Sequence, residues 1–211
     1  MQDLRGFSML LKNAKNSLNK ISKVLEKTHD DREILIKNTR QIINLCSESI
    51  IECHRNNITD AKKKSQAAGK LLEKYRRETD ASLHRYLITP EQEYVEAVSL
   101  LAIIEGRQVP TAEALKVKEE SYVLGLLDCI GEMRRNIYDK IRAGDVDDAK
   151  KIFEVMEDLY LTLYPFAYYD KIVKEARKKL DVDRILVEET RIAITEEIRR
   201  SELIRSIKSR K

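Results

Sequence analysis

Residues 119–144, EESYVLGLLDCIGEMRRNIYDKIRAG, decide the fold class, because they have the pattern of one long amphipathic helix with a defined end. Gly144 stands where a glycine that terminates a helix belongs, so the stretch predicts a helix from about Glu119 to Ala143. Its apolar residues recur at helical spacing and form one face: Tyr122, Leu126, Ile130, Met133 and Ile137.

The remainder of the chain has the same character, with apolar residues at helical spacing and no run of β-branched alternation. We therefore expect an all-α protein without a β-sheet, forming a single helical domain over residues 1–211. In the first half of the chain we expect one helix that ends near Thr28-His29-Asp30, a second over about 31–54, and a third that Thr59 or Asp60 caps and that runs to 79. A fourth helix is expected to open with the cap Thr89-Pro90-Glu91 and to end at Gly106, and a short fifth to run from the cap Thr111 to about 117. The remaining expected helices are 119–143, 146–164, and 170–209, the last split near Asp181-Val182-Asp183.

Composition excludes several classes of protein. Of the 211 residues, 36% are charged, and no run approaches the roughly 18 to 20 apolar residues that span a bilayer. We expect a soluble, cytoplasmic protein with no membrane association. The three cysteines, Cys46, Cys53 and Cys129, form no C-x-x-C pair and fall in apolar-periodic segments, so we expect buried free thiols.

Charge is unevenly distributed along the chain. Residues 1–80 hold 17 Lys/Arg against 11 Asp/Glu, although the whole chain has a net charge of only +4. The amino-terminal part is therefore the better candidate for a surface that faces phosphates. A run of lysines on a helix is nevertheless more often an ordinary solvated face.

The motifs of the common enzyme classes are absent from the sequence. There is no G-x-G-x-x-G or Walker A loop, no H-E-x-x-H and no G-x-S-x-G, and the chain has only three histidines. Nucleotide-cofactor, zinc and Ser-His-Asp chemistry are therefore not expected.

The helix over residues 91–104 places two carboxylates on an apolar face. At about 100° per residue, Glu93 and Glu96 share an arc with Ala97, Leu100 and Ile103. Like charges three residues apart repel one another, and burying them without partners is costly or forces protonation. A bound cation would resolve both problems.

A second acidic pair lies on the helix quoted first. Asp128 and Glu132 are four residues apart on one stripe, with Arg135 close beside them. Gly125 and Gly131 flank that stripe, and each costs about 1 kcal/mol relative to alanine in a helix. We therefore expect a neighbouring helix or a substrate to approach the backbone there.

Four carboxylates without a nearby His or Cys are hard oxygen ligands suited to Mg²⁺ or Mn²⁺. Such a site can activate water and stabilise the charge that develops on a phosphodiester. Acidic helix faces are common, however. Periodicity alone does not favour a metal site over a solvated face on which Asp128 and Glu132 pair with Arg134 or Arg135.

Several stretches resemble the translin/Trax family, and the Trax branch in particular. They run in order from His84-Arg85, through EYVEAVS at 93–99 and YVLG at 122–125 with Asp128, Gly131-Glu132 and Arg135, to Ala143-Gly144-Asp145. The resemblance implies an all-α subunit of about seven helices in a hollow, octamer-like assembly. It also implies a Mg²⁺-dependent endoribonuclease that cleaves single-stranded RNA inside that shell.

The resemblance also assigns roles to residues of this chain. The catalytic and metal-binding acids of the Trax branch correspond to Glu93, Glu96, Asp128 and Glu132, and the translin branch lacks most of them. His84, Arg85 and Arg135 are the expected RNA-binding residues. No basic amino-terminal extension of the eukaryotic Trax kind is present, so we expect a homo-oligomer of the archaeal type, without a separate translin-like partner.

Two other functions remain open from the sequence. A non-catalytic translin-like module would bind single-stranded nucleic acid through its basic face, in a salt-sensitive and EDTA-insensitive way. A di-iron carboxylate protein is the other alternative, although the chain has a single Glu-x-x-His element, at Glu26 and His29, where that fold needs two.

Overall fold

The computed structural model describes residues 10–209, and over that range the chain folds into seven α-helices and no β-strand. The all-α prediction is therefore confirmed. The elements in chain order are α2 (Lys12–His54), α3 (Ile58–Glu78), the 3₁₀ helix η1 (Ala81–Leu87), α4 (Ile88–Ile104), α5 (Ala112–Leu115), α6 (Glu119–Ala143), α7 (Val146–Leu163), the 3₁₀ helix η2 (Tyr164–Tyr169) and α8 (Ala176–Lys208).

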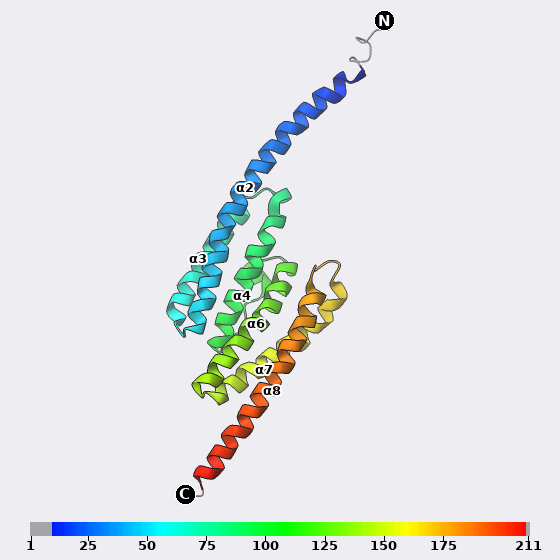
Figure 1. Ribbon diagram of the computed structural model, residues 1–211. Coiled ribbons are helices and arrows are strands. Elements are labelled where there is room, and N and C mark those ends of the chain that lie inside the picture. The colour runs from blue at the N-terminus through cyan, green and yellow to red at the C-terminus, as the bar shows by residue number, and fades with distance from the viewer. Residues whose placement is uncertain (1–9, 210–211) are drawn as a thin grey trace.

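The helices pack side by side around α4 and α6 (Figure 1). The α2–α3 hairpin packs on α4, while α7 and α8 pack on α6. The apolar face expected for α6 supplies much of the core, since Ile130, Met133 and Ile137 are completely buried. Gly144 ends α6 with a φ of +80°, a conformation that glycine adopts without strain.

The expected break at Thr28-His29-Asp30 does not occur, and α2 is one continuous helix of 43 residues. None of these residues is Pro or Gly, and the Thr28 hydroxyl donates to the Val24 carbonyl within the helix. Adding a residue to an existing helix costs little compared with starting a new one. The amino-terminal half of α2 consequently projects beyond the helical body as an arm (Figure 1). The apolar spacing of this first segment begins at Leu4, which lies outside the described residues.

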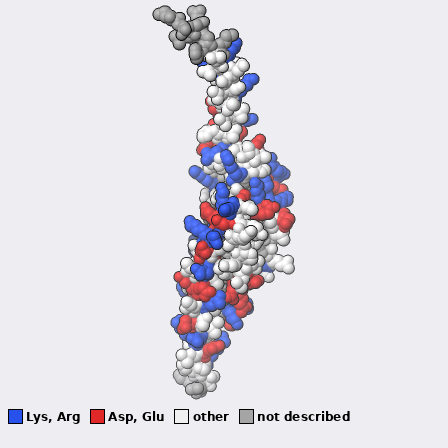
Figure 2. Space-filling view, turned by 90° about the vertical axis from the view of Figure 1, so that its right-hand side faces the viewer, with Lys and Arg blue, Asp and Glu red and all other residues white. Residues whose placement is uncertain are grey.

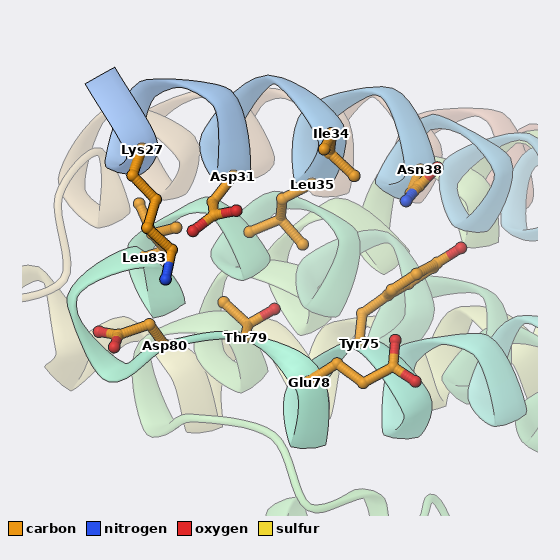
Figure 3. A pocket seen from close by; sticks show the side chains of 10 residues that line it. All are labelled: Lys27, Asp31, Ile34, Leu35, Asn38, Tyr75, Glu78, Thr79, Asp80 and Leu83. Carbon is orange, nitrogen blue, oxygen red and sulfur yellow. The ribbon is translucent and has the colours of Figure 1, made fainter. Parts of the chain in front are cut away.

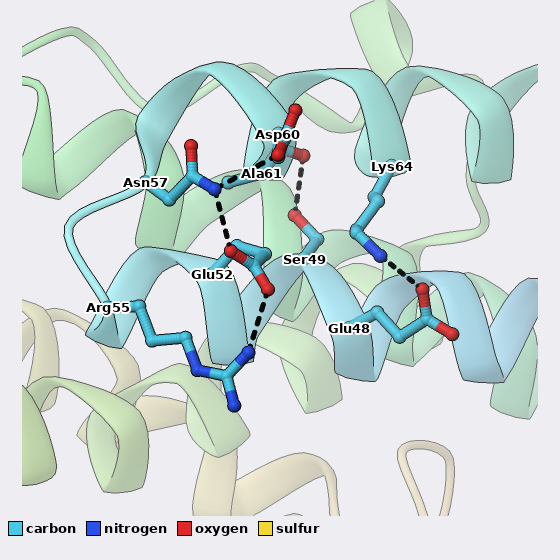
Figure 4. Close-up of polar contacts among 8 residues, drawn as sticks. All are labelled: Glu48, Ser49, Glu52, Arg55, Asn57, Asp60, Ala61 and Lys64. Atoms are coloured by element: carbon cyan, nitrogen blue, oxygen red, sulfur yellow. Dashed lines mark hydrogen bonds and ion pairs between the residues drawn. The ribbon is translucent and has the colours of Figure 1, made fainter.

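A polar network closes the turn between α2 and α3 (Figure 4). Asn56 adopts a left-handed conformation with a φ of +61°. Asn57 precedes the first residue of α3, so Thr59 and Asp60 lie within the first turn and are not its cap. The Asn57 side-chain amide donates to Glu52 and Asp60, and Ser49 donates to the Ala61 carbonyl at 2.8 Å.

The expected cap at Thr89 is wrong, because η1 leads directly into α4 at Ile88. Asp80 caps η1 by accepting from the Ser82 amide at 2.9 Å. Pro90 then falls within the first turn of α4, where an amide proton has no intrahelical partner to lose. The glycine end at Gly106 and the Thr111 cap of α5 are confirmed.

The last helix is also unbroken, contrary to the expected split near Asp181-Val182-Asp183. It begins at Ala176, after Glu175 in a left-handed conformation with a φ of +73°. Asp183 is buried on the side of α8 that packs on α6, so the residue expected to break the helix lies in the interior.

The base of the arm borders a pocket of about 380 Å³ between α2, α3 and η1. Figure 3 shows Lys27 and Asp31 reaching from α2 toward Thr79 and Asp80. Leu35 is the first buried residue along α2 and also lines this pocket, so the arm joins the helical body here. Over residues 10–209, no helix has both the length and the apolarity required to cross a membrane.

Candidate carboxylate site between α4 and α6

The close approach of α4 and α6 is set at Gly125. A Cβ atom added there would lie 2.5 Å from the Gln92 carbonyl oxygen and 2.6 Å from the Val95 Cβ. A side chain would therefore push the two helices apart. Of the two partners expected at this glycine, the neighbouring helix is the one observed. Gly131 differs, since an added Cβ would meet nothing within 4 Å.

This packing brings the two acidic faces into electrostatic contact. Burial first, and then the charges of Asp128, Glu93 and Glu132 in that order, raise the pKa of Glu96 to about 8. Burial also raises the pKa of Glu93, with a smaller contribution from Asp128. Within residues 10–209, neither Glu93 nor Glu96 makes a side-chain hydrogen bond or ion pair, so both carboxylates are partly buried without a partner.

Asp128 has a partner on each carboxylate oxygen. The Lys179 ammonium of α8 forms an ion pair with Oδ1, and the Gln92 side-chain amide donates to Oδ2. The charge of Lys179 partly opposes the increase in the pKa values of Glu93 and Glu96. A cation from a third helix therefore lies within the field of the acids on α4 and α6.

Glu132 is held by a histidine from the end of α2. The His54 Nε2 atom lies 2.5 Å from Glu132 Oε2, and its Nδ1 atom lies 3.6 Å from Asp139 Oδ2. The His54 hydrogen bond is the main cause that lowers the pKa of Glu132. Arg135, exposed beside it, approaches Glu132 at 3.8 Å.

A pocket of about 320 Å³ opens beside Asp128, between α6 and α8. Asp183 lines it; its side chain is buried, and its Oδ2 atom has no hydrogen-bond partner. Burial and then the charge of Asp128 raise the pKa of Asp183 to about 7. The remaining lining residues are Leu127, Asp128, Gly131, Glu175, Lys178, Lys179, Val182 and Leu186.

The other residues expected at an RNA site lie on η1 and have local partners. The His84 Nε2 atom is 3.0 Å from the Thr79 carbonyl oxygen. Arg85 is exposed, stacks on the Tyr86 ring at 5.0 Å and donates to its hydroxyl. Over the described part of the chain, neither side chain forms a hydrogen bond or ion pair with the four carboxylates.

Glu91 lies on α4 two residues before Glu93 and has a structural role. It is buried and accepts from the Arg76 guanidinium at 3.0 Å, the Lys118 amide at 3.1 Å and the Ser121 hydroxyl at 2.9 Å. These contacts join α3, α4 and the start of α6. Glu91, expected only as part of the opening of α4, thus connects three helices.

The three cysteines are free and buried, as expected. Cys46 and Cys129 lie near the carboxylates, whose charges add to the effect of burial in raising both thiol pKa values. Burial raises the pKa of Cys53 to about 12.

Surface charge is mixed in sign on the face that Figure 2 shows. Three consecutive lysines of the basic amino-terminal part pair with acids: Lys62 with Glu105, Lys63 with Asp60, and Lys64 with Glu48. Their charge is therefore largely compensated within the chain.

The donor set suits a hard cation, because the four acids offer carboxylate oxygens and two of them lack any partner. Among residues 10–209, however, no three His, Cys, Asp or Glu side chains already converge in metal-binding geometry. Asp128 is held by Lys179 and Glu132 by His54, so a cation that used all four acids would have to compete with these contacts.

The partners of the acids could not be predicted from the amino-acid sequence. Gln92 is next to Glu93 in the sequence, but an uncharged amide does not by itself indicate a contact with an acid. His54, Lys179 and Asp183 come from α2 and α8, far along the chain from the acids they surround. Periodicity assigns a residue to a face of its own helix, and it does not tell which other helix that face meets.

The fold and site together define an all-α protein with a carboxylate cluster between two closely packed helices. The chain belongs to the Translin family, whose model matches residues 13–189. It is 33% identical over 188 residues to the uncharacterized protein MJ0175 of Methanocaldococcus jannaschii, covering 88% of this chain and 84% of that protein.

Solved structures give the same result for the fold. A structure of AfC3PO in complex with duplex RNA superposes with a TM-score of 0.77 at 30% identity, covering 86% of this chain and 96% of that chain. A crystal structure of AfC3PO gives the same values. Apo-NeC3PO has a TM-score of 0.72 at 22% identity over 85% and 96% of the two chains, a likeness of fold alone.

Proposed function

We propose that this protein is a nucleic-acid-binding member of the Trax-like branch, of the archaeal type, and a cytoplasmic metal-dependent endoribonuclease that cleaves single-stranded RNA. The observation that carries the proposal is the cluster of Glu93, Glu96, Asp128 and Glu132, in which Glu93 and Glu96 are partly buried without partners. The complex of AfC3PO with duplex RNA supports RNA as the ligand class.

In this proposal, the four acids hold Mg²⁺, or Mn²⁺ in its place. A divalent cation bound there would supply Lewis acidity, which activates water and stabilises the charge developing on a phosphodiester. His54 keeps the Glu132 carboxylate oriented, and Gln92 does the same for Asp128. Arg135 is exposed next to Glu132 and is suited to contact the RNA backbone. His84 and Arg85 would contact the RNA farther along the same strand.

We further propose that the protein works as a hollow homo-oligomer, an octamer, without a separate translin-like partner. The support is the arm of α2, whose apolar side chains are exposed in the single chain: Leu11 is 55% exposed, Leu18 62%, Ile21 50% and Leu25 62%. Apolar stripes of this extent on a helix normally pack against another helix.

The test is cleavage of a labelled single-stranded RNA and of its duplex, each with Mg²⁺ or with EDTA. We expect Mg²⁺-dependent cleavage of the single strand, reduced at least about 100-fold in Glu96→Gln and in Asp128→Asn. Glu154→Gln, an exposed acid on α7, is the control and should cleave like wild type. Unchanged cleavage by both site variants would rule out the carboxylate site.

A specific observation also favours the non-catalytic alternative. Asp128 and Glu132 already have protein partners in Lys179 and His54, as structural acids do. A non-catalytic module would bind single-stranded RNA equally well with Mg²⁺ or EDTA, lose affinity with rising salt, and leave the RNA intact. The same assay therefore separates the two functions.

A further inference from the structure

The Lys179 side chain pairs with Asp128, one of the four acids proposed to hold a divalent cation. Its ammonium forms an ion pair with Asp128 Oδ1, and both side chains are only 24% exposed. In the absence of metal, this single positive charge offsets part of the repulsion among the acids of α4 and α6. A divalent cation that used Asp128 would repel the ammonium at short range.

A second acceptor for Lys179 is available on the same helix. Asp183 follows it by four residues, so the two side chains lie on one face of α8. Both line the pocket of about 320 Å³ beside Asp128. Asp183 Oδ2 is buried without a hydrogen-bond partner, and a buried acceptor in that state is costly.

Space for the movement exists next to the ion pair. Gly131 borders the same pocket, and a Cβ there would meet nothing within 4 Å. Lysine is suited to such a movement, since its charge is at the end of a flexible four-carbon chain.

We propose that Lys179 is a built-in competitor for the divalent cation: it pairs with Asp128 when the site is metal-free and transfers to Asp183 when a cation takes its place. This inference rests on the proposed function, because it assumes that Asp128 is a metal ligand. It assigns Lys179 and Asp183 a positioning role that tunes the affinity for metal. It also explains how the acidic cluster folds before metal binds.

The test measures Mn²⁺ affinity by titration calorimetry or by the electron paramagnetic resonance of free Mn²⁺, without RNA. We expect Lys179→Met to bind Mn²⁺ about tenfold more tightly than wild type, because a competing cation has been removed. Damage to the fold would not produce tighter binding. Lys179→Arg, which keeps the charge, should restore the weaker affinity.

Lys178→Met is the matched control, since Lys178 lines the same pocket and is exposed. Its affinity for Mn²⁺ should change less than about twofold, because its charge is screened by solvent. An unchanged or weaker affinity in folded Lys179→Met would overturn the inference.

A double-mutant cycle tests the role of Asp183. Asp183→Asn should weaken Mn²⁺ binding in the wild-type background, because Lys179 then lacks its second acceptor. In the Lys179→Met background the same substitution should have a smaller effect. Equal effects in both backgrounds would overturn the transfer to Asp183.

Failure of the inference can be told apart from failure of the proposed function. If wild type binds Mn²⁺ and Asp128→Asn abolishes that binding, the metal site stands and only the behaviour of Lys179→Met decides the competition. If neither wild type nor Lys179→Met binds Mn²⁺, the proposed metal site fails and the inference fails with it.

Discussion

Asp183 shows how a single buried charge shapes the behaviour of the protein. Its pKa is raised to about 7 by burial first and by the charge of Asp128 second, against 3.8 for an unperturbed group. Between those values the folded protein binds a proton that the unfolded chain has already released. The contribution of Asp183 to stability is therefore complete below about pH 3.8 and is lost as pH rises through about 7.

Replacing Asp183 by asparagine should remove this loss. We expect metal-free Asp183→Asn to be more stable than wild type above pH 7, by on the order of 2 kcal/mol, with the difference shrinking toward pH 4. Urea denaturation of both proteins across that range, in EDTA, measures it. A stability difference that stays constant with pH would show that Asp183 does not titrate in this interval.

At the scale of single residues, the positions of the four acids could be predicted from the sequence, but the side chains that contact them could not. Glu93 and Glu96 could be found because two carboxylates on an otherwise apolar arc are conspicuous. Asp128 and Glu132 could be found because they lie four residues apart on one stripe that two glycines flank. Lys179 and His54 could not, since each belongs to another helix and its contact depends on how the helices pack. Only the family resemblance connected the two acidic faces before the structure was known.

At the scale of the helices, the approach of α4 to α6 depends on one missing side chain. Gly125 faces the Gln92 carbonyl and Val95, whereas Gly131, on the same helix, faces open space. The two glycines share a helix but not an environment, which makes them a matched pair for substitution.

Gly125→Ala should destabilise the protein by about 2–3 kcal/mol, because backbone and Cβ atoms of α4 must move. Gly131→Ala should instead stabilise it by up to about 1 kcal/mol, the difference in helix propensity. The midpoint of urea denaturation distinguishes the two. Stabilisation by both substitutions would mean that α4 can move away from α6 without a cost in the free energy of unfolding.

The helices themselves were predictable where strong signals agreed. The bounds of α6 followed from an apolar face and a terminal glycine, and those are the observed bounds. The expected breaks at Thr28-His29-Asp30 and Asp181-Val182-Asp183 rested on weak helix formers alone. Such residues interrupt an isolated helix more readily than one already propagating from packed turns, so α2 and α8 run through them.

At the scale of the whole molecule, the arm of α2 leaves a stripe of apolar side chains exposed in the single chain. Leu11, Leu18 and Leu25 recur every seven residues, with Ala14 and Ile21 between them. This is the spacing of a helix that packs along another helix. Figure 1 shows the arm continuing, without a break in the helix, from the part of α2 that packs in the body.

Charged residues in the stripe should therefore reduce the assembly. The double variant Leu18→Glu with Leu25→Glu should have a smaller native mass than wild type by light scattering, because burying these charges at an interface is costly. Lys23→Glu, which changes a charge off the stripe, should leave the mass unaltered. A wild-type mass in the double variant would exclude the arm from the interface.

The three buried thiols give the protein an internal reporter. A thiol reacts through its thiolate, and Cys46, Cys53 and Cys129 all have raised pKa values. An alkylating reagent at neutral pH therefore has almost no thiolate to react with while the helices stay closed. Because Cys46 and Cys129 lie in the field of the acids of α4 and α6, their rate of labelling would time how often the carboxylate cluster opens to water.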